Sequence, residues 1–312
     1  MQERRAFLVI FAIAAALVIP AGITLRSVIH PVVLQVTSDN PTPLGYTWSL
    51  LLFIVPIGAL GWWFASRPDL KFPRKAFWRT LAVLAPLGFA LDLLFGNAFF
   101  IFPNKAATLG WGIPAMGGAI PIEEFVFYLA GFMLVLLSYI WCDEYWMAAY
   151  NVPDYAATAK NIPRIVRFHF GSVVLGVLLI AAAILYRKFW SGVPEGFPWY
   201  FVYLVCASLI PSAGFFHSAE PFINWRAFSF TFFLLLLISL LWEATLALPY
   251  AWWEYRPRNL MGLDIGAWSG LPIEAVCVWF AVTFTTVITY EVIKIWKALG
   301  TRALEAFFGI RK

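Results

Sequence analysis

Long apolar runs separated by short polar segments make up most of this chain. Eight of the runs approach the ~20 residues that an α-helix needs to cross a bilayer. They cover residues 6–26, 46–64, 78–102, 121–141, 165–186, 199–215, 227–249 and 273–296. The pattern therefore predicts an all-α integral membrane protein with about eight transmembrane helices. Pro86 and Pro211 fall inside two of them and predict kinks.

The first apolar run has two interpretations. Arg4 and Arg5 precede it, as basic residues precede the apolar core of a secretory signal. Its length is greater than a signal needs, which favours a helix that stays in the mature protein.

Charge distribution predicts the orientation in the membrane. With eight helices both termini lie on the same side, and cytoplasmic termini place most of the 22 Lys and Arg residues in cytoplasmic segments. The polar, turn-rich stretch 142–164 then becomes a cytoplasmic linker between a first unit, 1–141, and a second unit, 165–312. The expected location is the cell's plasma (inner) membrane.

Composition excludes several classes of protein. The chain is 62% hydrophobic and only 12% charged, which is unlike a soluble domain. Its net charge of +5 suits anionic lipid headgroups and requires no nucleic-acid partner. Three cysteines without paired spacing and three scattered histidines predict neither a disulfide framework nor a metal site.

The two units carry identical or chemically similar residues at positions separated by a constant offset of 151. The matched pairs are Asp92 with Glu243, Pro121 with Pro272, Glu123 with Glu274, and Tyr139 with Tyr290. Because each unit has an even number of helices, both enter the membrane from the same face. We therefore expect two parallel four-helix repeats related by an axis along the membrane normal.

Carboxyl groups inside apolar helices are costly and usually mark a working site. Helix geometry places five of them in the outer half of the membrane. These candidate catalytic residues are Asp92, Glu123, Glu124, Glu243 and Glu274. Glu291, near the inner end of the last helix, is expected either to snorkel or to pair with Lys294, and is left out of the site.

Structural roles could also account for these acids. Pro121 and Pro272 suit the first turn of a helix, and a Glu two residues later complements the positive end of the helix dipole. Hydrogen bonds between helices could hold Asp92 and Glu243. These alternatives remain open at the level of sequence.

Other membrane-enzyme motifs are absent from the sequence. Asp92 has no acidic partner four residues later, as a magnesium-diphosphate site would require. The Glu123–Glu124 pair is not followed by the Arg of intramembrane CAAX-type proteases. There is no phosphate-binding loop and no dinucleotide fingerprint. We therefore expect no metal and no cofactor.

The order of the motifs resembles the lycopene cyclase domain. An acidic residue inside a helix (ALD, LWE) is followed by a Gly-rich loop and by PIEE or PIEA, which opens a helix carrying the matched Tyr. The resemblance covers about 46–141 and 199–296. That family occurs as two small polypeptides or as a fused tandem, and it implies flavin-independent closure of a ring at an acyclic carotenoid end.

The chain departs from that family in three ways. Glu124 is matched by Ala275, so the second unit lacks one carboxyl. The first and fifth helices are additions to the usual unit, and no phytoene synthase domain is attached. The lost carboxyl indicates one principal site, with Glu123 and Glu124 at its core.

The implied chemistry is a redox-neutral isomerisation. An acid protonates the terminal alkene, the neighbouring double bond attacks the cation, and a base removes a proton. This requires a protonated carboxyl in a dry pocket and aromatic faces near the cation. The candidate substrate-binding residues are Phe125, Phe127, Tyr128, Trp242 and Trp279. The expected partner is a lipophilic isoprenoid in the bilayer; association with other carotenoid enzymes or with a second copy stays open.

Two other functions are compatible with the sequence. The missing carboxyl at Ala275 favours a carotenoid-binding protein or partner subunit without catalysis. The duplicated acids also fit a proton-linked transporter.

Overall fold

The computed structural model describes residues 42–67, 72–265 and 270–310. Within these ranges, seven helical spans are long and apolar enough to cross a membrane, so the expected all-α multi-pass architecture is confirmed. The predicted helix 6–26 lies outside the described residues. The spanning helices are α2 with α3 (Gly45–Ser49, Leu51–Ala65), α4 (Arg74–Phe99), α5 (Ile122–Trp141), α7 (Phe170–Phe189), α8 (Trp199–Ala219), α9 (Trp225–Trp242) and α10 (Glu274–Leu299).

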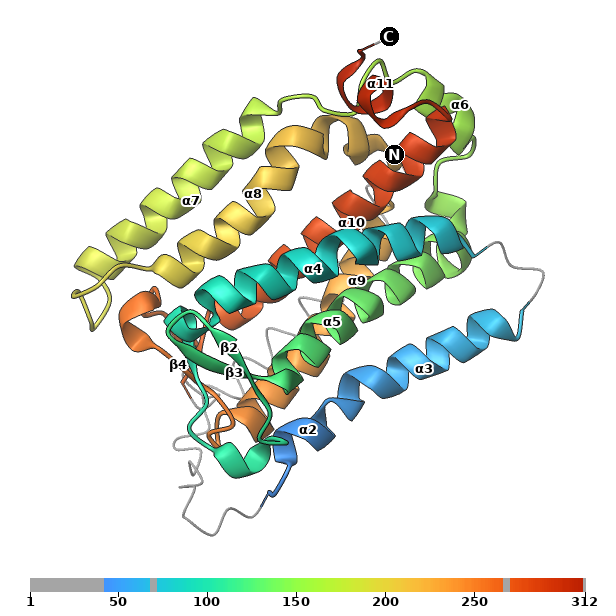
Figure 1. Cartoon of the computed structure of the whole chain (residues 1–312). Helices are drawn as coiled ribbons and strands as arrows, with labels where there is room; N and C mark the ends of the chain where they lie inside the picture. Colours follow the sequence, from blue (N-terminus) through green and yellow to red (C-terminus); the bar gives the residue numbers. More distant parts are fainter. Residues whose placement is uncertain (1–41, 68–71, 266–269, 311–312) are drawn as a thin grey trace.

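Two of these helices form the centre of the bundle. Helices α5 and α10 are the most buried spans, with 67% and 61% of their apolar windows buried, against 17% for α7. Helix α10 packs against α4, α5, α8 and α9, while α3 packs on α5 and α7 lies outermost against α8 (Figure 1). The largest group of buried apolar side chains lies where α5, α9 and α10 meet.

Most helices end within a few residues of the predicted limits, and the differences have local causes. Helix α7 begins at Phe170, five residues later than expected. The reason is that Ile165 and Val166, although apolar, donate backbone hydrogen bonds to the carbonyls of Ala306 and Phe307 in α11 (Ala303–Phe308). This pairing fixes them in an extended segment.

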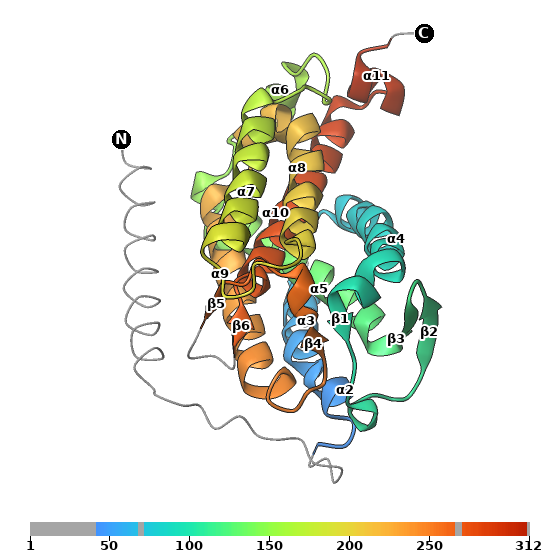
Figure 2. The ribbon, with the colours of Figure 1, turned by 90° about the vertical axis from the view of Figure 1, so that its left-hand side faces the viewer.

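Three two-stranded ribbons lie together at one end of the bundle, which we call the hairpin end (Figure 2). They pair β1 (Phe100–Ile101) with β4 (Glu254–Tyr255), β2 (Gly112–Ala115) with β3 (Gly118–Pro121), and β5 (Asp264–Ile265) with β6 (Leu271–Pro272). Strand β1 explains why α4 stops before residue 102, since Phe100 already pairs with Tyr255. The β1–β4 pair also ties together the two acid-bearing parts of the chain.

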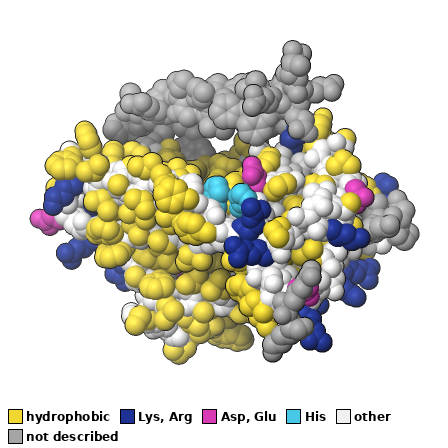
Figure 3. All heavy atoms as spheres, turned by 90° about the horizontal axis from the view of Figure 1, so that it is seen from above, with side chains coloured by type: hydrophobic (Ala, Val, Ile, Leu, Met, Phe, Trp, Pro, Cys, Tyr) yellow, Lys and Arg dark blue, Asp and Glu magenta, His cyan; other side chains and the backbone are white. Residues whose placement is uncertain are grey.

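The opposite end, which we call the Lys294 end, contains short helical segments and α11. The chain leaves α5 through a π-helical turn, Cys142–Trp146, and continues through a 3-10 turn, Ala148–Tyr150, and α6 (Tyr155–Lys160). When the molecule is seen from above the view of Figure 1, Lys and Arg side chains gather in patches beside broad apolar surfaces (Figure 3). Short 3-10 turns at Lys105–Ala107, Glu220–Phe222 and Pro257–Asn259 complete the described elements.

Candidate functional site

The hairpin end places an acidic first turn at the start of each central helix. In β2–β3, Pro121 pairs with Gly112 and the next residue donates from its backbone N–H to the carbonyl of Trp111 at 2.9 Å. In β5–β6, Pro272 pairs with Asp264, and the next residue donates to the carbonyl of Leu263 at the same distance. Each ribbon ends in a proline, whose fixed φ suits a helix start and which needs no hydrogen-bond acceptor.

Glu123 and Glu274 both accept backbone hydrogen bonds from the loop in front of their helix. The Oε1 atom of Glu123 accepts from the N–H of Leu109 at 2.7 Å and from Oγ1 of Thr47 at 2.6 Å. The Oε1 atom of Glu274 accepts from the N–H of Met261 at 2.5 Å. Both side chains are buried. Each carboxyl therefore fastens a loop to the positive end of its helix, in agreement with the structural alternative for these two residues.

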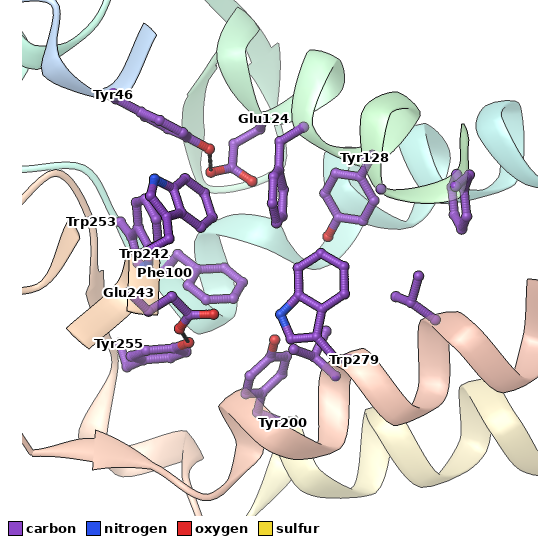
Figure 4. A pocket seen from close by; sticks show the side chains of 15 residues that line it. Tyr46, Phe100, Glu124, Tyr128, Tyr200, Trp242, Glu243, Trp253, Tyr255 and Trp279 are labelled. Atoms are coloured by element: carbon purple, nitrogen blue, oxygen red, sulfur yellow. Dashed lines mark hydrogen bonds between the residues drawn. The ribbon is translucent and has the colours of Figure 1, made fainter. Parts of the chain in front are cut away.

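Glu124, the next residue of α5, points the other way, into a pocket. Its Oε1 accepts a hydrogen bond from the hydroxyl of Tyr46, which opens α2 (Figure 4). Successive residues of a helix are about 100° apart around its axis. Anchoring Glu123 to the loop therefore turns Glu124 towards the bundle interior.

Glu243 enters the same pocket from α9. It begins the π-helical turn Glu243–Ala247 that follows α9, and such turns are frequent at functional sites. Its Oε2 accepts from the hydroxyl of Tyr255 at 2.5 Å and its Oε1 accepts from Oγ of Ser239 at 3.0 Å. Burial, together with the adjacent Glu243, holds the pKa of Tyr255 well above its usual value. The phenol therefore stays protonated and donates to the carboxyl.

Aromatic rings form most of the wall between the two carboxyls. Trp242 lies at the centre, with ring centroids 4.9 Å from Phe127, 4.6 Å from Trp253 and 5.9 Å from Tyr46. Among the described residues, the lining comprises Tyr46, Phe100, Glu124, Phe127, Tyr128, Gly131, Phe132, Tyr200, Trp242, Glu243, Trp253, Tyr255, Val278, Trp279 and Val282. The space between these atoms, including the open side of the pocket, is about 640 Å³. Lys, Arg and His are missing from this lining, so the two acids face rings and phenols.

Asp92 lies beside this pocket without lining it. Its Oδ1 is 3.4 Å from the hydroxyl of Tyr128, a weak hydrogen bond, and Tyr128 does line the pocket. Asp92 is buried, and its Oδ2 has no hydrogen-bond partner in the described part of the chain. Gly96, one turn later, leaves the space for this carboxyl, since a Cβ there would lie 2.6 Å from Oδ1. Asp92 therefore contacts the pocket lining through its hydrogen bond with Tyr128 and does not line the pocket itself.

The structure brings together six of the ten predicted site residues. Those lining the pocket are Glu124, Glu243, Phe127, Tyr128, Trp242 and Trp279. Asp92 lies behind Tyr128, while Glu123 and Glu274 face their loops. Phe125 packs against Phe89 with centroids 5.3 Å apart, outside the lining.

Sequence reasoning missed several aromatic lining residues. These are Tyr46, Phe100, Phe132, Tyr200, Trp253 and Tyr255. A tandem Trp followed by Tyr255, twelve positions after Glu243, was the available signal, but such residues are also typical of an interfacial belt. Nothing in the sequence marks Tyr46, because its hydrogen bond joins residues 78 positions apart.

A second group of acids, of which Asp143 and Glu291 are buried, lies at the Lys294 end, far along α5 and α10 from the pocket. The Nζ of Lys294 lies 3.3 Å from Asp143, 3.3 Å from Glu144 and 3.6 Å from Glu291. Glu291 is completely buried and also accepts from the hydroxyl of Tyr155 at 2.8 Å. Of the two expectations for Glu291, pairing with Lys294 is therefore confirmed and snorkelling is wrong.

Among the described residues there is no group of three His, Cys, Asp or Glu side chains arranged to hold a metal ion. Comparisons with protein families, curated proteins and solved structures found no match to this chain. The site must therefore be interpreted from its own geometry.

Proposed function

We propose that this protein is a carotenoid cyclase that closes an acyclic, lycopene-type end group within the membrane. The observation that carries the proposal is the pair Glu124 and Glu243, which reach one aromatic pocket from different helices. Each is hydrogen-bonded by a phenol, Tyr46 or Tyr255. The resemblance of the flanking motifs to the lycopene cyclase domain supports the same function.

The proposed reaction needs only the groups in this pocket. One carboxylic acid gives its proton to the terminal alkene, leaving a tertiary cation. The π electrons of the neighbouring double bond form the new carbon–carbon bond, and the cation moves into the ring. The second carboxylate removes a proton from a carbon next to that cation, so the product is an isomer of the substrate. The two acids exchange roles between turnovers or return the proton through the phenols.

The remaining lining suits a cationic intermediate. The faces of Trp242, Phe127 and Trp279 can stabilise positive charge. An apolar lining excludes water, which would otherwise add to the cation and give an alcohol. The rings that line the pocket leave a narrow interior, so they must move apart to admit an end group. The polyene tail would remain in the bilayer, in the outer leaflet if both termini are cytoplasmic in the plasma membrane.

Product analysis in a lycopene-accumulating host tests the proposal. We expect wild-type protein to convert lycopene to ring-bearing carotenoids, and we expect Glu124→Gln to leave lycopene unconverted. The matched control is Glu195→Gln, which removes an exposed carboxyl from the loop between α7 and α8. In membranes assayed in D₂O, each ring closed should gain one deuterium, because the acid exchanges its proton with solvent.

A non-catalytic carotenoid-binding protein is the second candidate. Ala275, which stands where a second Glu124 would be, and the narrow pocket both favour it. It would co-purify with lycopene but leave the carbon skeleton unchanged. If correctly inserted wild-type protein bound lycopene without converting it, the cyclase proposal would be rejected. Uptake that depends on a pH gradient, without any change in pigment, would also reject it and would indicate a transporter.

A further inference from the structure

A cationic groove lies at the Lys294 end, between the first turn of α4 and the last turns of α10. Its lining includes Arg74, Lys75 and Lys297, with Phe72 and Tyr155 on its walls, and the space inside it, including its open side, is about 740 Å³. Arg74 and Lys75 are exposed, and Lys297 is half-buried. The groove is therefore open to an incoming ligand and is remote from the aromatic pocket.

The positive charge of this groove is not neutralised by the part of the chain that the structure describes. Lys294 also lines it, but its ammonium group is engaged by three carboxylates. Arg74, Lys75 and Lys297 form no ion pair with any described carboxylate. Arg79 and Lys75 are also close enough to Lys297 for their like charges to repel it. An anion bound in the groove would weaken this repulsion. The described carboxylates would compete little with it, because they form no ion pairs with Arg74, Lys75 or Lys297.

The residues around the groove indicate that it lies at the depth of the lipid headgroups in a membrane. Trp78, one turn into α4, is 61% exposed, and exposed Trp is typical of the membrane–water interface. Arg79 lies over the ring of Trp296, with its Cζ 5.0 Å from the ring centroid. The groove thus combines cations with an apolar wall at Phe72. A phospholipid presents the complementary arrangement, a phosphate above acyl chains.

We propose that this groove binds the headgroup of an anionic phospholipid from the adjoining leaflet. The phosphate would lie between Lys75 and Lys297, and the first acyl carbons would contact Phe72. The site is independent of the proposed cyclase, because none of its residues lines the aromatic pocket. It would hold the ends of α4 and α10 together where their own charges repel.

Lipid binding to the purified full chain tests this assignment. Delipidated protein in neutral detergent is titrated with phosphatidylglycerol or phosphatidylcholine and followed by native mass spectrometry. We expect a clear preference for phosphatidylglycerol. The double variant Lys75→Gln/Lys297→Gln should lose affinity by about five-fold per charge, about thirty-fold in all. The matched control, Lys105→Gln/Lys188→Gln, removes two exposed charges near the hairpin end and should lose less than two-fold.

Three outcomes would overturn the proposal. They are equal binding of the two lipids, equal loss in both double variants, and displacement of the lipid by millimolar inorganic phosphate, which would indicate a free-anion site. Should the double variant fail to fold, Arg74→Gln provides the same comparison at an exposed position. The readout is lipid binding, so it does not depend on whether the protein turns over carotenoid.

Discussion

The two acid-bearing segments, α4–α5 and α9–α10, share one local design and differ in the part that makes the pocket. In both, a two-stranded ribbon ends at a proline, and the Glu two residues later accepts a backbone N–H from the preceding loop. These are Glu123 with Leu109 and Glu274 with Met261. The matched tyrosines also meet, with the rings of Tyr139 and Tyr290 5.9 Å apart.

The difference lies in the other acids. Glu124 in the first segment faces the pocket, whereas Ala275 occupies that position in the second. In the other matched pair, Glu243 lines the pocket with two direct donors, while Asp92 stands behind Tyr128 with one long hydrogen bond. The pocket therefore takes one carboxyl from each segment, and those two carboxyls are not matched to each other. The comparison indicates that Glu123 and Glu274 maintain the architecture, while the proposed function assigns the chemistry to Glu124 and Glu243.

The largest effect should come from removing a pocket carboxyl. Under the proposed function, Glu124→Gln or Glu243→Gln should lower the rate of ring formation by about 10²–10⁴-fold, because each removes a group that transfers a proton. Initial rates in isolated membranes, normalised to protein amount, measure this effect. A fall below ten-fold in both variants would contradict the assignment of acid and base to this pair.

Adding the missing carboxyl tests the comparison from the other side. Ala275 is completely buried, so Ala275→Glu would place an unpaired carboxyl among packed side chains. We expect it to lower the free energy of unfolding by about 2–4 kcal/mol and to create no second active pocket. Thermal unfolding in detergent measures the first effect. The matched control is Ala275→Ser, whose side chain is smaller than that of Glu and neutral, and it should lower the free energy of unfolding by less. A stable Ala275→Glu protein with increased turnover would contradict the single-pocket interpretation.

Asp92→Asn should have a smaller effect than the change at its matched position. Asp92 does not line the pocket and contacts its lining through Tyr128, so we expect about a ten-fold loss of rate, compared with at least 100-fold for Glu243→Gln. Tyr128→Phe should reproduce the effect of Asp92→Asn, and the double variant should lose no more than either single variant. Additive losses would show that Asp92 acts on the substrate independently of Tyr128.

The sequence predicted the membrane helices and the candidate acids. It did not predict where some helices end or which acid faces the pocket, and the reasons lie in particular residues. Apolar length identifies a span, but it cannot detect that Phe100 pairs as a strand with Tyr255 or that Ile165 pairs with Ala306. The constant offset identified the acidic first turns. It could not decide between Glu123 and Glu124, since they differ by about 100° around the helix and only the loop contact at Leu109 fixes which one faces inward.

The smallest effect should come from the matched pair itself. Glu123→Gln and Glu274→Gln keep an acceptor for the loop N–H but lose the charge that favours the helix start. We therefore expect each to lower the free energy of unfolding by about 1 kcal/mol and to change the rate of ring formation by less than about three-fold. Glu123→Gln is also the strictest control for Glu124→Gln, because the two changes are chemically identical and adjacent in α5. If Glu123→Gln abolished ring formation while leaving stability unchanged, the division between architectural and chemical acids would be wrong. Glu123 would then have to reach the substrate in a state where its hydrogen bond with the N–H of Leu109 is broken.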